Sequence, residues 1–136
     1  MTIISERFQK NERLCSRKTI EELFSNGKSF YCQSFQVIWN HADDTLQAPA
    51  SIAVSVPKKN FRSAVQRNRI RRKIREAYRH QKHVLYHHLE KSGRKIVFMI
   101  IFKSSTEPDY NEIFQLTGKI ISILTEQITA AKEITE

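Results

Sequence analysis

A run of seven apolar residues, "IVFMIIF" at 96–102, most restricts how this chain of 136 residues can fold. The run is too short to span a bilayer but has the length of a strand. A strand that is apolar on both faces must be covered on both faces, which is typical of the centre of a sheet. The sequence therefore predicts a central buried strand with other elements packed against it.

Two further strands are predicted before this run. The segment "SFYCQSFQVIWN" at 29–40 alternates apolar and polar side chains and predicts one long strand, with a break near Gln33. The segment "ASIAVSV" at 50–56 predicts a second strand, which Pro57 ends. Both strands are candidates to join the central run in one sheet.

A short helix is predicted ahead of the strands, within residues 16–27. Ser16 can cap this helix, or Thr19 can cap it in a capping box with Glu22. The dipeptide "NG" at the end of the range predicts a left-handed stop.

Two longer helices are predicted from apolar residues that recur at helical spacing. One runs from about Ser63 to Glu90 and stops at Gly93, and the other contains residues 113–124. Helices packed on one sheet make an α+β sandwich. We expect a single domain over 1–136, with 1–10 as a flexible arm.

Positive charge is concentrated in one stretch of the chain. The net charge is +9, and the range Lys58–Lys82, called the basic segment below, holds eleven lysines and arginines against one acid, Glu76. So little acid leaves few ion-pair partners within the segment itself. A concentrated basic stripe predicts a docking face for the phosphates of a nucleic acid.

The helix that carries this charge is dominated by arginine. Arg67, Arg71, Arg75 and Arg79 form a ridge at i, i+4 spacing. The planar guanidinium grips phosphate with two hydrogen bonds, whereas lysine acts mainly as a point charge. Displacing counterions from several phosphates gives strong, salt-sensitive binding that depends little on sequence.

RNA is the better partner for this helix than DNA. A zipper protein needs a leucine heptad after its basic region, and "HQKHVLYHHLEKSG" does not supply one. Rings on a sheet can stack on unpaired bases, and one or two at most of four strand aromatics are expected to do so here. These are Phe30, Tyr31, Phe35 and Trp39.

The stretch "SVPKKNFRSAVQRNRIRRKIREAYR" at 55–79 resembles the protein subunit of bacterial ribonuclease P. That family has an Arg-Asn-Arg core, preceded by Ser-Val, paired lysines and Ala-Val, and followed by a basic run with Arg-Glu and an aromatic. The matching residues are Ser55, Val56, Lys58, Lys59, Ala64, Val65, Arg67, Asn68, Arg69, Arg71, Arg72, Arg75, Glu76, Tyr78 and Arg79. The segment 13–30 looks like the family's first helix and turn, so the resemblance spans about residues 11–130.

The resemblance implies a fold and an activity. The fold is a sandwich of helices on a mixed sheet of about four strands, like the second domain of ribosomal protein S5. A left-handed βαβ crossover carries the Arg-Asn-Arg helix. The activity is removal of the 5′ leader of precursor tRNA by an endoribonuclease in which this chain is the accessory subunit. A catalytic RNA performs the cleavage with Mg²⁺, and the protein holds no metal tightly.

The resemblance also implies roles for individual residues and partners for the chain. No catalytic residue is expected in the protein. The residues expected to contact the catalytic RNA are Lys58, Lys59, Arg62, Arg67, Arg69 and Arg72. The residues expected to line a cleft for the leader are Phe24, Ser55, Asn68, Arg71 and Arg75. The partners are the catalytic RNA and precursor tRNA, without a membrane or an obligate protein partner.

The sequence departs from the family at three points. Ile20 and Ile38 stand where many members carry aromatic rings in the cleft, so Phe24 or Trp39 would have to supply base stacking. The link after the paired lysines lacks a glycine that many members have, and Arg62 is expected to add a phosphate contact there.

Cytoplasmic location is expected because no signal segment or membrane span is evident. Cys15 and Cys32 belong to no cysteine motif, so we expect two free, semi-buried thiols.

Three other functions remain to be weighed. A protein-only nuclease needs converging carboxylates, but the acids are scattered: Asp43 and Asp44 lie in a turn, and Asp109 with Glu112 opens a helix. A zinc site could use histidines four apart, but no acid or cysteine completes it, so solvated or RNA-facing rings are expected. The histidines are His80, His83, His87 and His88. The main alternative is a ribosomal or other structured-RNA-binding protein with no role in cleavage.

Overall fold

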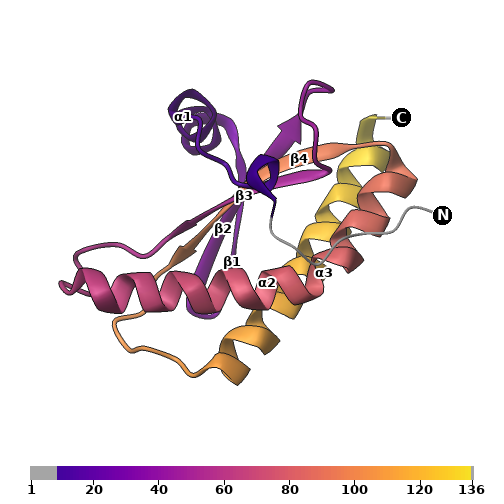
Figure 1. Ribbon diagram of the computed structural model, residues 1–136. Coiled ribbons are helices and arrows are strands. Elements are labelled where there is room, and N and C mark those ends of the chain that lie inside the picture. Colours follow the sequence, from indigo (N-terminus) through magenta and orange to yellow (C-terminus); the bar gives the residue numbers. More distant parts are fainter. Residues whose placement is uncertain (1–8, 136) are drawn as a thin grey trace.

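The computed structural model describes residues 9–135, which form a short 3-10 helix, three α-helices and four strands (Figure 1). In chain order these elements are η1 Lys10–Glu12, α1 Arg17–Asn26, β1 Lys28–Cys32, β2 Phe35–Ala42, β3 Ala50–Ser55, α2 Ala64–Ser92, β4 Lys95–Phe102 and α3 Tyr110–Thr135. Of the expected flexible arm, residues 1–8 lie outside this range, and Lys10 already belongs to η1.

The strands form one mixed sheet in the order β1-β2-β4-β3. β4 is an interior strand that pairs antiparallel with β2 and parallel with β3. All its residues from Ile96 to Phe102 are buried, which confirms the central strand predicted from the apolar run.

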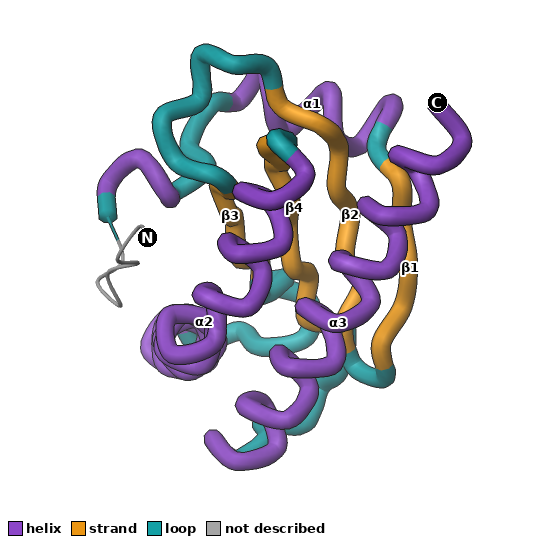
Figure 2. Tube along the Cα trace, turned by 90° about the vertical axis from the view of Figure 1, so that its right-hand side faces the viewer, coloured by secondary structure: helices purple, strands orange, loops and turns teal. Residues whose placement is uncertain are grey.

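Each face of the sheet packs on different helices, so the two sides of β4 belong to separate apolar clusters. Phe98 and Ile100 belong to the large core between the sheet and helices α2 and α3. Met99 and Ile101 belong to a smaller cluster with Leu23 of α1 on the opposite face. Figure 2 shows α2 and α3 in front of the sheet and α1 behind it. This arrangement confirms the α+β sandwich.

The connection from β3 through α2 to β4 is a left-handed crossover. In Figure 2 the helices lie in front of the sheet, β4 runs downwards, and it lies to the right of its parallel neighbour β3. A connection that leaves β3, passes through a helix in front of the sheet and enters β4 on this side is left-handed. Almost all connections between parallel strands are right-handed. The feature implied by the family resemblance is therefore present.

The long strand predicted over 29–40 is wrong, because the segment forms a hairpin. β1 and β2 pair antiparallel up to Cys32 and Phe35, with Gln33 and Ser34 in the turn. Gln33 has a φ of 51°, the left-handed conformation that tight hairpin turns require. The alternation of apolar side chains located the break correctly, but a glutamine there gave no signal for a complete reversal.

The stop predicted for α1 is also different in the structure. The Ser16 hydroxyl accepts a hydrogen bond from the Thr19 N–H, as expected for a cap. Gly27, however, is extended with a φ of −72° rather than left-handed. A Cβ at Gly27 would lie 2.5 Å from the Leu23 carbonyl oxygen and 2.6 Å from Ile38 Cγ2. Glycine is needed there for close packing and not for its conformational freedom.

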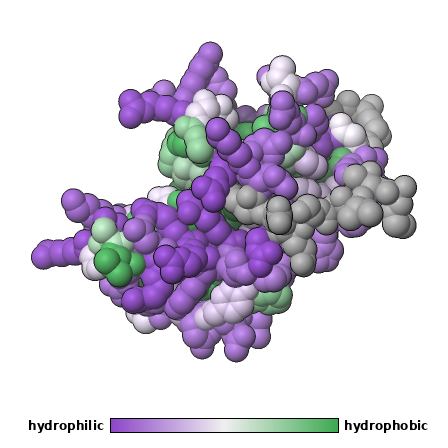
Figure 3. All heavy atoms as spheres, viewed as in Figure 1, coloured by the Kyte–Doolittle hydropathy of each residue, from purple (hydrophilic) through white to green (hydrophobic). Residues whose placement is uncertain are grey.

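The long helix α2 begins and ends where the sequence places its signals. The Ser63 hydroxyl accepts a hydrogen bond from the Gln66 N–H, and Gly93 ends the helix with a φ of 67°. Ile70 and Ile74 are completely buried. The N-terminal half of α2 projects past β3, and hydrophilic side chains cover most of its visible surface (Figures 1 and 3). Among the described residues, no helix has both the length and the apolar character to cross a membrane.

A buried ion pair joins the N-terminal segment to the middle of α2. The Lys82 Nζ lies 2.7 Å and 2.9 Å from the two carboxylate oxygens of Glu12. The exposed fractions of these side chains are only 1% and 6%. Lys82 was counted in the basic segment as a surface charge, so that part of the prediction is wrong.

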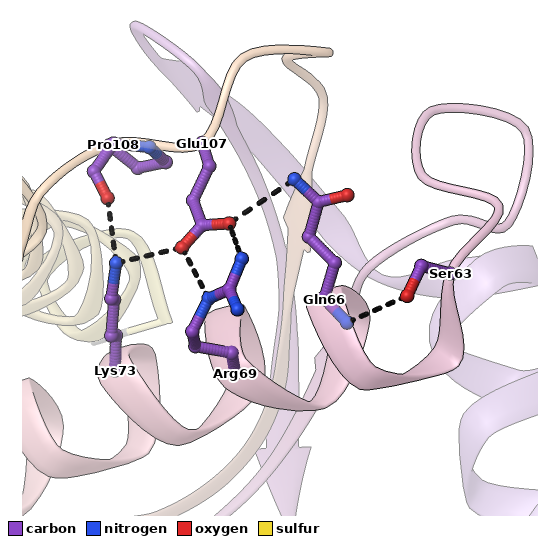
Figure 4. A network of polar contacts seen from close by, with 6 residues as sticks. All are labelled: Ser63, Gln66, Arg69, Lys73, Glu107 and Pro108. Atoms are coloured by element: carbon purple, nitrogen blue, oxygen red, sulfur yellow. Dashed lines mark hydrogen bonds and ion pairs between the residues drawn. The ribbon is translucent and has the colours of Figure 1, made fainter.

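A second acid holds the N-terminal half of α2 to the loop between β4 and α3. Glu107 accepts two hydrogen bonds from the Arg69 guanidinium, at 2.7 Å and 2.8 Å, and one from Lys73 at 2.9 Å (Figure 4). Gln66 donates a further hydrogen bond to the same carboxylate. These bonds, first from Arg69 and then from Lys73, lower the pKa of Glu107 to about 2.

The buried ion pair predicts that Glu12→Ala destabilises the protein by about 3–5 kcal/mol, because it leaves the Lys82 ammonium buried without this carboxylate. Urea unfolding at neutral pH measures the difference. The double variant Glu12→Leu/Lys82→Met should lose much less, since it buries no charge. A Glu12→Ala protein as stable as the wild type would contradict this role.

The Glu107 contacts predict a stability difference that depends on pH. The folded state lowers the pKa of this carboxyl from 4.5 to about 2, so its contribution is complete above pH 4.5 and is lost as the pH falls towards 2. Glu107→Gln should therefore destabilise the protein by about 1 kcal/mol at pH 7. The difference from the wild type should shrink steadily below pH 4.5 in urea titrations. Glu126 is an exposed acid of α3, and Glu126→Gln serves as the control. This variant should have nearly the same unfolding free energy as the wild type at pH 7 and below pH 4.5.

Candidate nucleic-acid interface

A groove of about 410 Å³ runs along the exposed side of α2. Its lining residues come from the N-terminal half of this helix and from the segment before α1. They are Arg13, Asn68, Arg71, Arg72, Arg75, Glu76 and Arg79. Five guanidinium groups therefore surround a space that a phosphate-bearing chain could occupy.

The arginines inside this groove repel one another. Burial lowers the pKa of Arg75, and the positive charges of Arg13 and Arg71 lower it further. The one acid of the groove, Glu76, pairs with the groove's own Arg79 (Nη2 at 2.6 Å) and with His80 (Nε2 at 3.0 Å), which leaves Arg71, Arg72 and Arg75 without a carboxylate partner within residues 9–131. An anion that enters from outside would relieve the repulsion, which makes the groove a favourable site for phosphate.

Arg13 is the member of the groove that the sequence did not reveal. Arg13 forms an isolated parallel bridge with Ile52, and the Leu14 N–H donates to the Ile52 carbonyl at 2.8 Å. These bonds, with the neighbouring Glu12–Lys82 pair, hold the segment between β3 and α2. The contacts that place Arg13 beside α2, those with Ile52 and the Glu12–Lys82 pair, join residues distant along the chain, so no local pattern could have pointed to it.

The residues predicted to line the leader cleft fall into two places. Asn68, Arg71 and Arg75 share the groove, and the Asn68 Oδ1 accepts a hydrogen bond from Arg71 at 2.7 Å. Phe24 is on α1 with 60% of its surface exposed. Ser55 ends β3 opposite Ile101, on the face of the sheet that carries α1. The structure thus brings three of the five together.

The residues predicted to contact the catalytic RNA also separate into groups. Lys58, Lys59 and Arg62 are exposed in the loop before α2. Arg67 donates to the carbonyls of residues 61 and 62, at 2.7 Å and 2.8 Å, and so closes this loop onto the helix. Arg72 lies in the groove, beside residues of the leader set.

The basic segment forms ion pairs with acids from outside it, which the sequence did not predict, because Glu12 and Glu107 lie far from the segment in the chain. Four of its eleven basic residues have carboxylate partners, namely Arg69, Lys73, Arg79 and Lys82. Arg69 is the one member of the predicted RNA-binding sets with such a partner in the described part of the chain. Within residues 9–131 the other seven have none: Lys58, Lys59, Arg62, Arg67, Arg71, Arg72 and Arg75.

The strand aromatics are mostly core residues. Trp39 is completely buried, and its Nε1 donates to Gln127 at 2.6 Å, so the expectation that it could stack on a base is wrong. Phe35 is also buried, and Phe30 is partly buried. Tyr31 is different, because 68% of its surface is exposed.

The remaining candidate groups are dispersed. The part of the chain that the structure describes contains no cluster of three potential metal ligands, and His83 and His87 are exposed. Asp109 caps α3 by accepting from the Glu112 N–H at 2.9 Å, as expected. Both cysteines are free, but one is exposed and the other buried, so neither is semi-buried.

Comparison with known proteins identifies the family and supports the fold. The family model described as Ribonuclease P matches residues 8–125. The ribonuclease P protein component of Porphyromonas gingivalis is 39% identical over 106 residues, which cover 76% of each chain. The protein component of Nitrosococcus oceani is 31% identical over 92 residues, covering 68% of this chain and 70% of that one.

Solved structures give the same fold at lower identity. The RNase P protein of Staphylococcus aureus has a TM-score of 0.63 at 20% identity, covering 83% of this chain and 94% of that chain. The RNase P protein of Thermotoga maritima has a TM-score of 0.63 at 20% identity, covering 85% and 96%. With its family model matched over most of its length, the chain belongs to the ribonuclease P protein family.

Proposed function

We propose that this chain is the protein subunit of a ribonuclease P ribonucleoprotein in the cytoplasm. It binds a catalytic RNA and the 5′ leader of precursor tRNA, and thereby promotes endonucleolytic removal of the leader. The groove on α2 carries the proposal. Asn68, Arg71, Arg72 and Arg75 line it, and its one acid is already bonded to Arg79.

The groove suits an RNA backbone for chemical reasons. Each guanidinium offers a planar fork of donors that matches two phosphate oxygens. The like charges of Arg71 and Arg75 are held together by the fold and not by counter-charges, so the site is organised before RNA arrives. Bound phosphates replace the missing anions and release counterions, which makes binding strongly dependent on salt.

The exposed loop before α2 suits the second RNA partner. Lys58, Lys59 and Arg62 extend the positive surface beyond the groove, and the Arg67 bonds to the loop carbonyls fix its path. The same helix can therefore contact the catalytic RNA on one side and the leader on another. In this proposal cleavage belongs to the catalytic RNA, which also supplies the Mg²⁺ sites, and the protein contributes position and charge.

Reconstitution tests the proposal. The chain, a bacterial catalytic RNA and a precursor tRNA are mixed at low magnesium, and the release of the leader is followed with time. We expect faster cleavage than with the RNA alone, because the basic groups reduce repulsion between the two RNAs. Unchanged cleavage would instead favour an RNA-binding protein without a role in processing. Cleavage by the chain without the RNA would also contradict the proposal.

Substitutions in the groove test where the leader binds. Arg71→Ala and Arg75→Ala should each weaken binding of leader-bearing precursor about tenfold, while mature tRNA is affected less. Each should also reduce the slope of log affinity against log salt by about 1. Lys91→Ala, an exposed basic residue at the other end of the same helix, is the matched control and should change neither quantity. Equal losses for precursor and mature tRNA would remove these arginines from the leader site.

A further inference from the structure

One row of residues crosses the α1-bearing face of the sheet at the end where β3 stops. The strand register pairs Tyr31 with Gln36, Gln36 with Ile101, and Ile101 with Ser55. Ile101 belongs to the cluster under α1, so the side chains of its row neighbours share that face. The row therefore leads from Ser55, a predicted leader residue, to Tyr31 on the edge strand β1.

Tyr31 is the exposed aromatic of this row, with 68% of its surface accessible. Within residues 9–131 its hydroxyl makes no hydrogen bond and its ring makes no contact with another aromatic ring. The rings of Phe35 and Trp39, by contrast, are buried in the core on the other face. An open aromatic surface at the edge of the sheet is suited to stacking on a flat ligand.

Positive charge lies along the row and favours a polyanion over a protein partner. Beyond Ser55 the chain continues to the exposed Lys58 and Lys59 and to the arginines of α2. Lys103 lies two residues after Ile101, and its N–H donates to the Ser34 carbonyl at 2.7 Å. Strand alternation therefore brings the exposed Lys103 to the same face, next to the β1–β2 hairpin. Acidic side chains are absent from the four positions of the row.

We propose that Tyr31 stacks on an unpaired base of the leader after the RNA strand has crossed the sheet from Ser55. This inference rests on the proposed function and extends it. Three strand spacings separate Ser55 from Tyr31, roughly 14 Å, so a strand of several nucleotides is required to reach both. Tyr31 would thus select for leaders long enough to cross the sheet, with little preference for the base because every base has a stacking face.

The packing under α1 explains why the ring is on β1. Ile38 is only 6% exposed and packs with Leu23, while Ile20 lies partly buried against the same cluster. These positions serve the apolar contact between α1 and the sheet, so they offer no open ring to a base. Tyr31 lies in the next row, which reaches this cluster through Ile101, and on the edge strand β1 its ring remains accessible.

The test compares three variants in the complex with the catalytic RNA. Tyr31→Thr removes the ring but keeps a residue favourable to strands, and Tyr31→Phe keeps the ring without the hydroxyl. Phe114→Ala removes a partly exposed ring from α3, on the opposite side of the sheet, as the matched control. Equilibrium affinity is measured for mature tRNA and for precursors with leaders of increasing length, and for a long leader with single abasic positions.

We expect Tyr31→Thr to weaken binding of long-leader precursor about tenfold and to leave short-leader precursor and mature tRNA unchanged. Tyr31→Phe and Phe114→Ala should bind like the wild type. One abasic position in the leader should reduce wild-type affinity and have no further effect on Tyr31→Thr.

Other outcomes separate this inference from the proposed function. If wild-type affinity increases with leader length but Tyr31→Thr shows the same increase, the role of Tyr31 is overturned and the proposed function stands. If the wild type itself does not distinguish leader lengths, binding of the leader fails as a function. A loss in Tyr31→Phe equal to that in Tyr31→Thr would also overturn stacking, because the ring would then be insufficient.

Discussion

The apolar contact between α2 and the sheet is what allows so many arginines to share one helix. Like charges at i, i+4 spacing cost about 0.2–0.5 kcal/mol per pair, and the ridge from Arg67 to Arg79 contains three such pairs. Complete burial of Ile70 and Ile74 contributes about 1.5–3 kcal/mol for each side chain, which outweighs the repulsion. The helix therefore forms without RNA, and the unrelieved repulsion becomes a driving force for binding phosphate.

Two acids from outside the groove stabilise the helix that carries it, and the acid inside the groove, Glu76, pairs with Arg79. Glu12 holds the middle of α2 through Lys82, and Glu107 holds its outer flank through Arg69 and Lys73. Glu12 belongs to η1 and Glu107 to the loop between β4 and α3, and both segments pack against α2. The charges that face the groove receive no such partner from Glu107, since Arg71 and Arg75 lie on another side of the helix. Ion pairs that stabilise the helix and the charges proposed to bind RNA are thus separated by helical periodicity.

Local patterns in the sequence were sufficient for most elements and insufficient for the contacts between them. The ends of α2 and the central position of β4 depend on side chains within or next to each element, and both predictions are confirmed. The reversal at Gln33 depends on a backbone conformation that glutamine does not signal. The Glu12–Lys82 pair joins residues far apart in the chain. The acids close to Lys82 in the sequence therefore did not reveal that Lys82 has a carboxylate partner.

The same limit applies to the proposed RNA site. Helical spacing was enough to group Arg71 with Arg75. For an aromatic side chain on the sheet, however, burial depends on which face the side chain occupies and on which element covers that face. Trp39 and Tyr31 have the same parity in the sequence, yet the hairpin at Gln33 changes the relation between strand position and face. Trp39 consequently joins the core while Tyr31 points to the α1 side. The hairpin turn at Gln33 thereby determines which ring is exposed on the α1 side, and the alternation of side chains read straight through that turn does not predict it.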